Sequence, residues 1–66
     1  MRTFLENPNV QHYLAHGGAE WVANALAVDY LRKMNVDERP GAMAWLETNY
    51  PAMAQLVRRD YPHHTV

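Results

Sequence analysis

Two histidines that lie four residues apart, His12 and His16, have the first spacing in this chain that could support chemistry. Residues four apart share one face of a helix, so the two imidazoles could hold a zinc ion between them. His63 and His64 could add ligands if the C-terminal segment folded back. The three residues between the first pair include no glutamate of the kind that zinc hydrolases carry in such a motif. We therefore expect an exposed polar stripe, with no metal and no cofactor.

A second group of residues could contact nucleic acid. The stretches 40–49 and 51–60 have the lengths of the two helices in a helix-turn-helix motif. Arg58 and Arg59 would then contact phosphates, and Gln55 could contact the edge of a base. However, the second stretch begins with proline, and the formal net charge of −1 provides no general attraction for a polyanion. A small DNA-binding transcriptional regulator is therefore the alternative function, and nucleic acid is not the favoured partner.

The residue types that enzymes use for catalysis are scarce. The chain contains no serine and no cysteine, which removes the commonest nucleophiles. The Gly17-Gly18 pair precedes a helical stretch, but no strand leads into it and no Lys-Ser or Lys-Thr pair follows, so a phosphate-binding loop is not indicated. A chain of 66 residues also has difficulty enclosing a pocket of ligand size. We expect a protein without catalytic residues that is not an enzyme.

The most apolar part of the chain runs from Trp21 to Val28, where Asn24 is the single polar residue. It lies within residues 19–34, which lack proline and glycine and are rich in helix formers, so a long central helix is predicted. On a helical wheel this helix has two apolar faces. One contains Val22, Ala23, Leu26, Ala27, Tyr30 and Met34, with Leu31 at its edge. The other, roughly opposite, contains Trp21, Ala25 and Val28 and is shared with Arg32.

Two apolar faces on one helix need two packing partners, and so short a chain has little material to cover both. Disulfide bonds cannot compensate, because there is no cysteine. We therefore predict a homodimer in which Trp21, Ala25 and Val28 meet their counterparts across a twofold axis. Asn24 would be the buried amide that fixes the register of the two helices. A heterodimer with another chain would satisfy the same pattern.

Turn signals divide the rest of the chain into further helices. They are Asn7-Pro8, Gly17-Gly18, the Asp37 cap, the break at Tyr50-Pro51 and the end at Tyr61-Pro62. β-Branched residues are few and do not alternate, which argues against a sheet. The sequence thus predicts an all-α fold, a compact bundle of about four helices around the central apolar helix 19–34. It predicts a single helical domain over 1–62 and a frayed tail over 63–66.

Aromatic side chains are the remaining signal for function. Two tryptophans, four tyrosines and one phenylalanine are more rings than so small a core can bury completely. Tryptophan, tyrosine and arginine are also the residues that most often anchor protein interfaces. We expect a non-enzymatic protein-binding module, an adaptor or inhibitor that occupies a surface of a larger, unidentified protein. Its expected contact residues are Trp45 and Tyr61 as anchors, with Arg32, Arg58 and Arg59 at the rim.

The sequence also bears on location. No N-terminal segment has the layout of a signal peptide. The apolar run of eight residues is far shorter than the roughly 20 that a membrane-spanning helix requires. The absence of cysteine suits a reducing compartment. We expect a cytoplasmic protein with no membrane partner.

Overall fold

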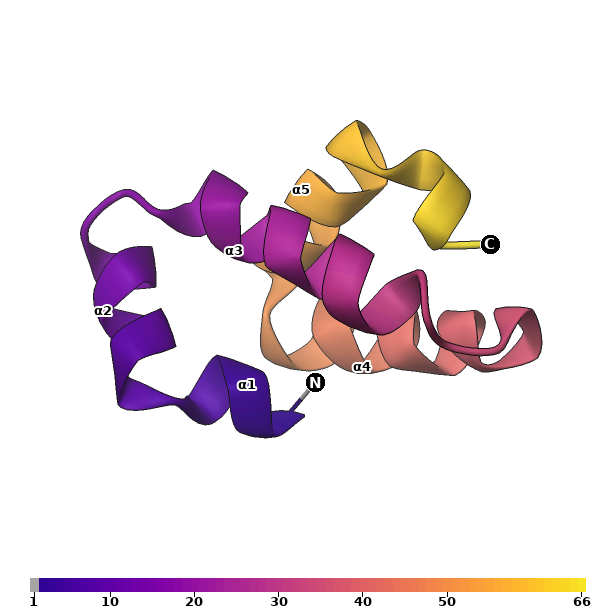
Figure 1. Ribbon diagram of the computed structural model, residues 1–66, viewed down its shortest axis with the longest axis horizontal. Helices are drawn as coiled ribbons and strands as arrows, with labels where there is room; N and C mark the ends of the chain where they lie inside the picture. The colour runs from indigo at the N-terminus through magenta and orange to yellow at the C-terminus, as the bar shows by residue number, and fades with distance from the viewer. Residues whose placement is uncertain (1) are drawn as a thin grey trace.

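The computed structural model describes residues 2–66, which form five α-helices and no strand. The helices are α1 (Arg2–Glu6), α2 (Pro8–Ala15), α3 (Ala19–Leu26), α4 (Arg39–Asn49) and α5 (Pro51–Asp60). The molecule measures 32 × 21 × 20 Å, with α1 and α2 at one end and α4 and α5 behind α3 (Figure 1). The all-α fold and the compact bundle are confirmed. The predicted number of about four helices agrees roughly, since α1 is a single short turn.

The central helix is built from two consecutive elements. α3 continues without a break into η1 (Ala27–Leu31), which has π-helical geometry. The N–H of Arg32 donates a 2.8 Å hydrogen bond to the carbonyl of Ala27, five residues back, which is the π pattern. Together the two elements cover 19–31, so the helix ends three residues before the predicted boundary at 34.

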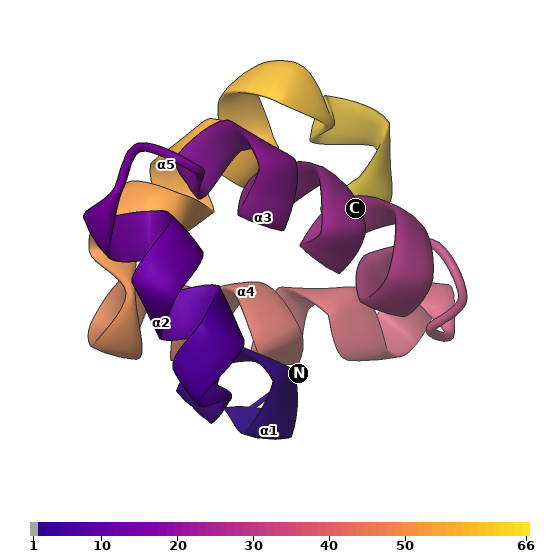
Figure 2. The same ribbon diagram turned by 60° about the vertical axis from the view of Figure 1, so that its left-hand side comes forward.

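The hydrophobic core lies on the inner side of this central helix. α5 packs against both α3 and α4, while α2 packs against the start of α3. Figure 2 shows α1 and α2 following one another along one side of the bundle. The buried residues that form the core are Leu5, Val10, Val22, Ala23, Leu26, Leu31, Met43, Leu46, Met53, Ala54 and Val57. The central helix therefore buries the broad apolar face that the helical wheel predicts.

The turn between α2 and α3 depends on its two glycines. Gly17 has a φ of +88°, a left-handed conformation that side chains with a Cβ avoid. Gly18 approaches α2 so closely that an added Cβ would lie 2.9 Å from the carbonyl oxygen of Tyr13. These two residues let the chain reverse sharply, and they place the end of α2 directly beside the beginning of α3.

The helix starts agree only in part with the sequence. Asn7 is the N-cap of α2, as predicted, and its side chain accepts a 2.8 Å hydrogen bond from the N–H of Asn9. Asp37 does not cap the next helix. It lies in the 3₁₀ turn η2 (Val36–Glu38), and α4 begins at Arg39 without a side-chain cap. The turn explains the shift, because it forms its own bond from the N–H of Glu38 to the carbonyl of Asn35.

The C-terminal residues differ from the frayed tail expected over 63–66. They form the 3₁₀ turn η3 (Pro62–His64), which packs against η1, and Thr65 is only 7% exposed. The Thr65 hydroxyl donates a 2.9 Å hydrogen bond to the carbonyl of Pro62. Contacts with distant parts of the chain hold the segment in place, and turn signals in the sequence do not reveal such contacts.

No helix among residues 2–66 has the length and the apolar character needed to cross a membrane.

Candidate protein-interaction face

The side of the central helix that points away from the core is the candidate functional site. We call it the outer face and define it as Trp21, Asn24, Ala25, Val28 and Arg32. Trp21 is 57% exposed, Asn24 and Arg32 are exposed, and Ala25 and Val28 are half-buried. No other helix passes in front of α3 in the view of Figure 1. The four residues expected at a dimer interface thus lie on one side of one helix, and the single chain leaves that side open.

An exposed aromatic pair extends the outer face at its N-terminal end. The rings of Tyr13 and Trp21 lie 5.2 Å apart between centroids, tilted by 38°, and Tyr13 is 51% exposed. The pair exists because the close approach of Gly18 to α2 brings Tyr13 alongside α3. Sequence reasoning did not place Tyr13 at this site. The only signal was the Gly17-Gly18 turn, which brings the adjoining ends of two helices together.

Asn24 is tied to the C-terminal segment. Its side-chain amide donates a hydrogen bond to the hydroxyl of Tyr61, 37 residues further along the chain. The ring of Tyr61 in turn stacks on His64 at 5.9 Å between centroids. Asn24 therefore uses one of its polar atoms within its own chain, and Tyr61 borders the outer face.

Charges of opposite sign lie at the two ends of the outer face. Glu20 is in the first turn of α3, and its carboxylate lies 3.2 Å from a guanidinium nitrogen of Arg59 on α5. Arg32 and Lys33 follow the end of η1, and neither forms an ion pair with any residue of the described chain. The negative charge at the beginning of the face is therefore paired with Arg59, and the end of the face carries Arg32 and Lys33 close in sequence to the exposed Asp29.

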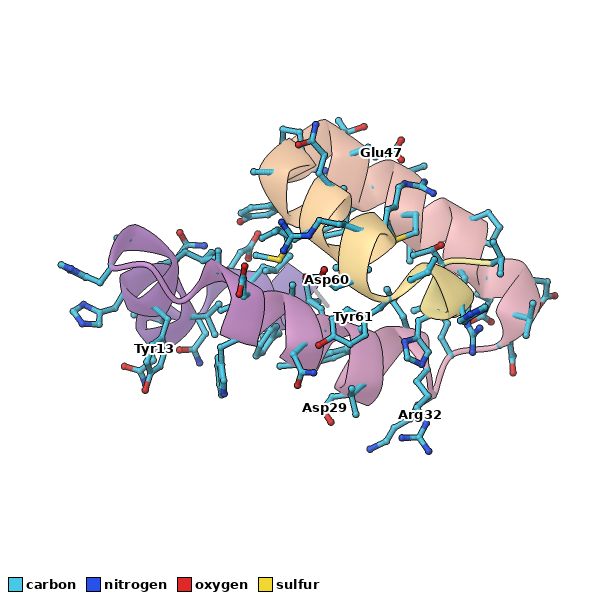
Figure 3. The ribbon with its side chains drawn as sticks, turned by 90° about the horizontal axis from the view of Figure 1, so that it is seen from above. Tyr13, Asp29, Arg32, Glu47, Asp60 and Tyr61 are labelled. Atoms are coloured by element: carbon cyan, nitrogen blue, oxygen red, sulfur yellow. The ribbon has the colours of Figure 1, made fainter. Side chains whose placement is uncertain are left out.

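Figure 3 shows the same arrangement from above, with Tyr13, Asp29 and Arg32 along one edge of the molecule. Glu47 lies at the opposite edge. Arg58 belongs to that far side, because its Nε donates a 2.8 Å hydrogen bond to the Glu47 carboxylate. The structure therefore separates Arg32 from Arg58, although both were expected at the rim of one partner-binding surface.

The other expected partner contacts lie near α5. Trp45 on α4 is half-buried, and its ring lies 5.8 Å from the ring of Tyr50. Arg59 donates from Nε to the Asp60 carboxylate at 2.9 Å as well as pairing with Glu20. Both arginines of α5 are thus paired with carboxylates of the same chain.

These pairs change the acidity of the groups involved. The side-chain hydrogen bond from Arg59 lowers the pKa of Asp60 below its ordinary value, because it stabilises the charged carboxylate. The same hydrogen bond, followed by the one to Glu20, raises the pKa of Arg59 above its ordinary value. Both side chains are exposed at the surface, so the pair is a weak interaction.

An apolar groove lies on another side of the molecule, where the start of α3 meets the corner between α4 and α5. It has a volume of about 380 Å³ and is lined by Leu14, Ala19, Asn49, Tyr50, Pro51, Ala52, Met53 and Leu56. A second hollow of about 330 Å³ continues from it along α5, lined by Ala52, Gln55, Leu56 and Arg59. Sequence reasoning missed this groove, because its lining comes from four separate segments.

The two histidines of α2 lie close together. The rings of His12 and His16 are 4.4 Å apart between centroids. Across residues 2–66, however, no three side chains of the His, Asp or Glu type come together as a metal-binding group. The pair alone would supply two ligands, fewer than the three or four that zinc sites in proteins use.

Comparisons with known protein families, curated proteins and solved structures find no match to this chain. The outer face and the groove are therefore the features from which a function can be inferred.

Proposed function

We propose that this chain is a non-enzymatic protein-binding module, an adaptor or inhibitor that acts by occupying a surface of a larger partner protein. The observation that carries the proposal is the exposed pair of Trp21 and Tyr13, which are 57% and 51% exposed and in contact with each other. Adjoining apolar groups that stay in water mark interaction sites, and these two residue types are the usual anchors of protein interfaces.

The first element of the proposal is a homodimer formed through the outer face. Ala25 and Val28 lie at its centre and are small enough to let a second helix approach closely. Trp21 would be the anchor, with Asn24 and Tyr61 at the edge of the contact. Covering this face would remove from water the apolar surface that the protein's own helices leave open.

The second element of the proposal is the contact with the larger partner, which would bind in the apolar groove. Its lining is mainly apolar, and the ring of Tyr50 in its wall rests on Trp45. Arg59 lies at the far end of the adjoining hollow. We assign the groove to apolar side chains on a helix of the partner, the usual occupant of an apolar groove between helices. Two of the expected contacts, Trp45 and Arg59, would then border the bound helix.

Filling the groove tests this assignment. Ala52 is exposed and lines both hollows, so Ala52→Arg would block them without disturbing the core. Ala44→Arg is the matched control, because Ala44 is equally an exposed helical alanine but lies outside the groove. We expect a partner isolated on the wild-type protein to bind Ala44→Arg with the same affinity and Ala52→Arg at least about tenfold more weakly, a loss of 1.4 kcal/mol. Equal binding to all three proteins would refute the assignment.

The alternative function, DNA binding through α4 and α5, gains no support from the charges on these helices. Arg58 pairs with Glu47, and Arg59 pairs with Asp60 and Glu20, so each arginine has a carboxylate beside it. Phosphates would have to displace these carboxylates. If duplex DNA nevertheless bound with a steep dependence on salt, the protein-binding proposal would be replaced by this one.

A further inference from the structure

The two histidines of α2 form an exposed pair whose ring nitrogens are free for a ligand. His12 and His16 are four residues apart, so they share one face of the helix, and their rings lie 4.4 Å apart between centroids. Within residues 2–66 neither imidazole forms a hydrogen bond or an ion pair. Because both side chains are exposed, each ring can turn a nitrogen towards the other without giving up a buried contact.

The distance between the rings fits two imidazoles that are bound to one metal ion. A metal–nitrogen bond of about 2.0 Å, with the ring centroid about 1.2 Å further on, sets each centroid about 3.2 Å from the ion. A right angle at the ion then separates the two centroids by about 4.5 Å, and a tetrahedral angle separates them by about 5.2 Å. The observed 4.4 Å agrees with the right angle, which is typical of tetragonal Cu²⁺ and Ni²⁺ sites.

The position of the pair in α2 also favours a cation. His12 lies in the last turn of the helix, and His16 is its C-cap. The last carbonyls of a helix carry a partial negative charge, which stabilises a cation nearby. No lysine or arginine occurs on α2 or α3, the two helices that meet at this end of the molecule (Figure 1).

We propose that His12 and His16 chelate one Cu²⁺ ion through one nitrogen of each imidazole. Cu²⁺ is the divalent first-row ion that nitrogen ligands bind most tightly. Water occupies the other coordination positions, because within residues 2–66 no third side chain of the His, Asp or Glu type joins the pair. The sequence pattern alone argued against a zinc site, and the distance between the rings is what points to a copper chelate. With two protein ligands the ion is exchangeable, unlike the ion in a closed structural site.

The chelated ion would lie beside the exposed aromatic pair of Tyr13 and Trp21. The ring of His12 is 6.4 Å from the ring of Tyr13 between centroids, and Tyr13 contacts Trp21. A donor atom of a bound protein could replace one of the waters on the ion. The chelate itself needs neither a partner protein nor a second copy of the chain, so this inference stands apart from the proposed function.

Calorimetric titration of the purified protein with Cu²⁺ tests the chelate. Losing either ligand of a chelate loses the whole gain of holding both on one chain, so His12→Gln and His16→Gln should each weaken binding at least about tenfold. The double variant should bind no more weakly than either single variant. His63→Gln is the matched control, because His63 is an exposed histidine outside the pair, and it should leave the affinity unchanged. Two single variants that each keep the wild-type affinity would overturn the proposal.

Spectroscopy of the bound ion tests the site independently of affinity. The electron paramagnetic resonance spectrum should be that of a tetragonal Cu²⁺ with two imidazole nitrogens in the wild-type protein and one in either single variant. Paramagnetic broadening of the amide resonances should centre on His12 and His16. Broadening centred on His63 and His64 would overturn the proposed site. Circular dichroism without metal should show the same helix content in all variants, because the substituted side chains are exposed.

A comparison of metals tests the right angle at the ion. Zn²⁺ prefers tetrahedral coordination, and it also follows Cu²⁺ in the order of affinities, so it should bind at least about tenfold more weakly. Zn²⁺ binding as tight as that of Cu²⁺ would overturn the proposed geometry.

Discussion

The guanidinium of Arg39 lies against the C-terminal end of the central helix, where its Nε donates a 2.8 Å hydrogen bond to the carbonyl of Leu31. Its Nη2 reaches the carbonyl of Arg32 at 3.1 Å, and its Nη1 reaches those of Val66 and His63 at 3.0 and 3.3 Å. The last carbonyls of a helix lack partners within the helix and carry a partial negative charge. One arginine therefore caps the central helix and binds the C-terminal segment to it.

Replacing Arg39 with methionine should lower the free energy of unfolding by about 2–3 kcal/mol, because several hydrogen bonds to a charged group are lost in a half-buried place. Urea denaturation measures the loss, and hydrogen exchange at the Thr65 amide should accelerate with it. Arg58→Met is the control, since its ion pair with Glu47 is exposed and worth less than about 1 kcal/mol. Equal losses of stability in the two variants would show that the hydrogen bonds of Arg39 contribute no more than an exposed ion pair.

Replacing each of the three glycines by alanine should change the stability of the fold, and the direction of the change should depend on the position. Gly17→Ala should destabilise the fold by about 1–2 kcal/mol, because its φ of +88° is strained for any side chain with a Cβ. Gly18→Ala should also destabilise it, since the new methyl would lie 2.9 Å from a backbone oxygen that cannot easily move. Gly41→Ala meets open space in α4 and should stabilise the helix by up to about 1 kcal/mol. Thermal melts of the three variants should therefore differ in sign, and a loss at Gly41 would contradict the prediction.

The hydrogen bond between Asn24 and Tyr61 should contribute little to the free energy of unfolding. Asn24 is exposed, so water can replace the lost partner, and Tyr61→Phe should cost about 0.5–1 kcal/mol. A double-mutant cycle with Asn24→Ala isolates the bond, and the coupling free energy should be about 0.5 kcal/mol. Additive effects of the two substitutions would mean that the contact does not persist in solution.

The pair of Asp60 and Arg59 predicts a specific pH dependence. Because the pKa of Asp60 is lowered in the folded protein, the charged carboxylate stabilises the fold, and this contribution to stability is fully present above the ordinary pKa of the carboxyl. That contribution is lost as the pH falls through the lowered value, in the region below about pH 4. Titration of the Asp60 carboxyl by NMR should show the lowered pKa, and Arg59→Gln should bring it back towards the ordinary value. Arg58→Gln should leave it unchanged, because Arg58 pairs with Glu47. A lowered pKa that survives Arg59→Gln would exclude this hydrogen bond as its cause.

Features with a local cause in the sequence were the ones that could be predicted. Helical periodicity alone places Leu26 and Trp21 on different faces of the central helix. In the structure Leu26 is buried and Trp21 is exposed. The Asn7 cap is equally local. The contact between Tyr13 and Trp21, the groove, and the attachment of the C-terminal segment through Arg39 all join residues from different helices. Their geometry depends on how helices pack, which helical periodicity does not encode.

The clearest test of the two faces compares two substitutions on the same helix. Leu26 is completely buried, so Leu26→Ala should lower the free energy of unfolding by about 2–5 kcal/mol through the cavity that it creates. Trp21 is 57% exposed, so Trp21→Gln should cost less than about 1 kcal/mol in urea denaturation at concentrations where the protein is a single copy. The two substitutions should have the opposite ranking in their effect on dimer formation, measured at high protein concentration. Trp21→Gln should abolish the dimer, and Leu26→Ala should leave it intact under conditions where that variant remains folded. If Trp21→Gln instead unfolded the single copy as severely as Leu26→Ala, the tryptophan would belong to the core. The outer face would then lose the largest apolar side chain that the proposed dimer covers.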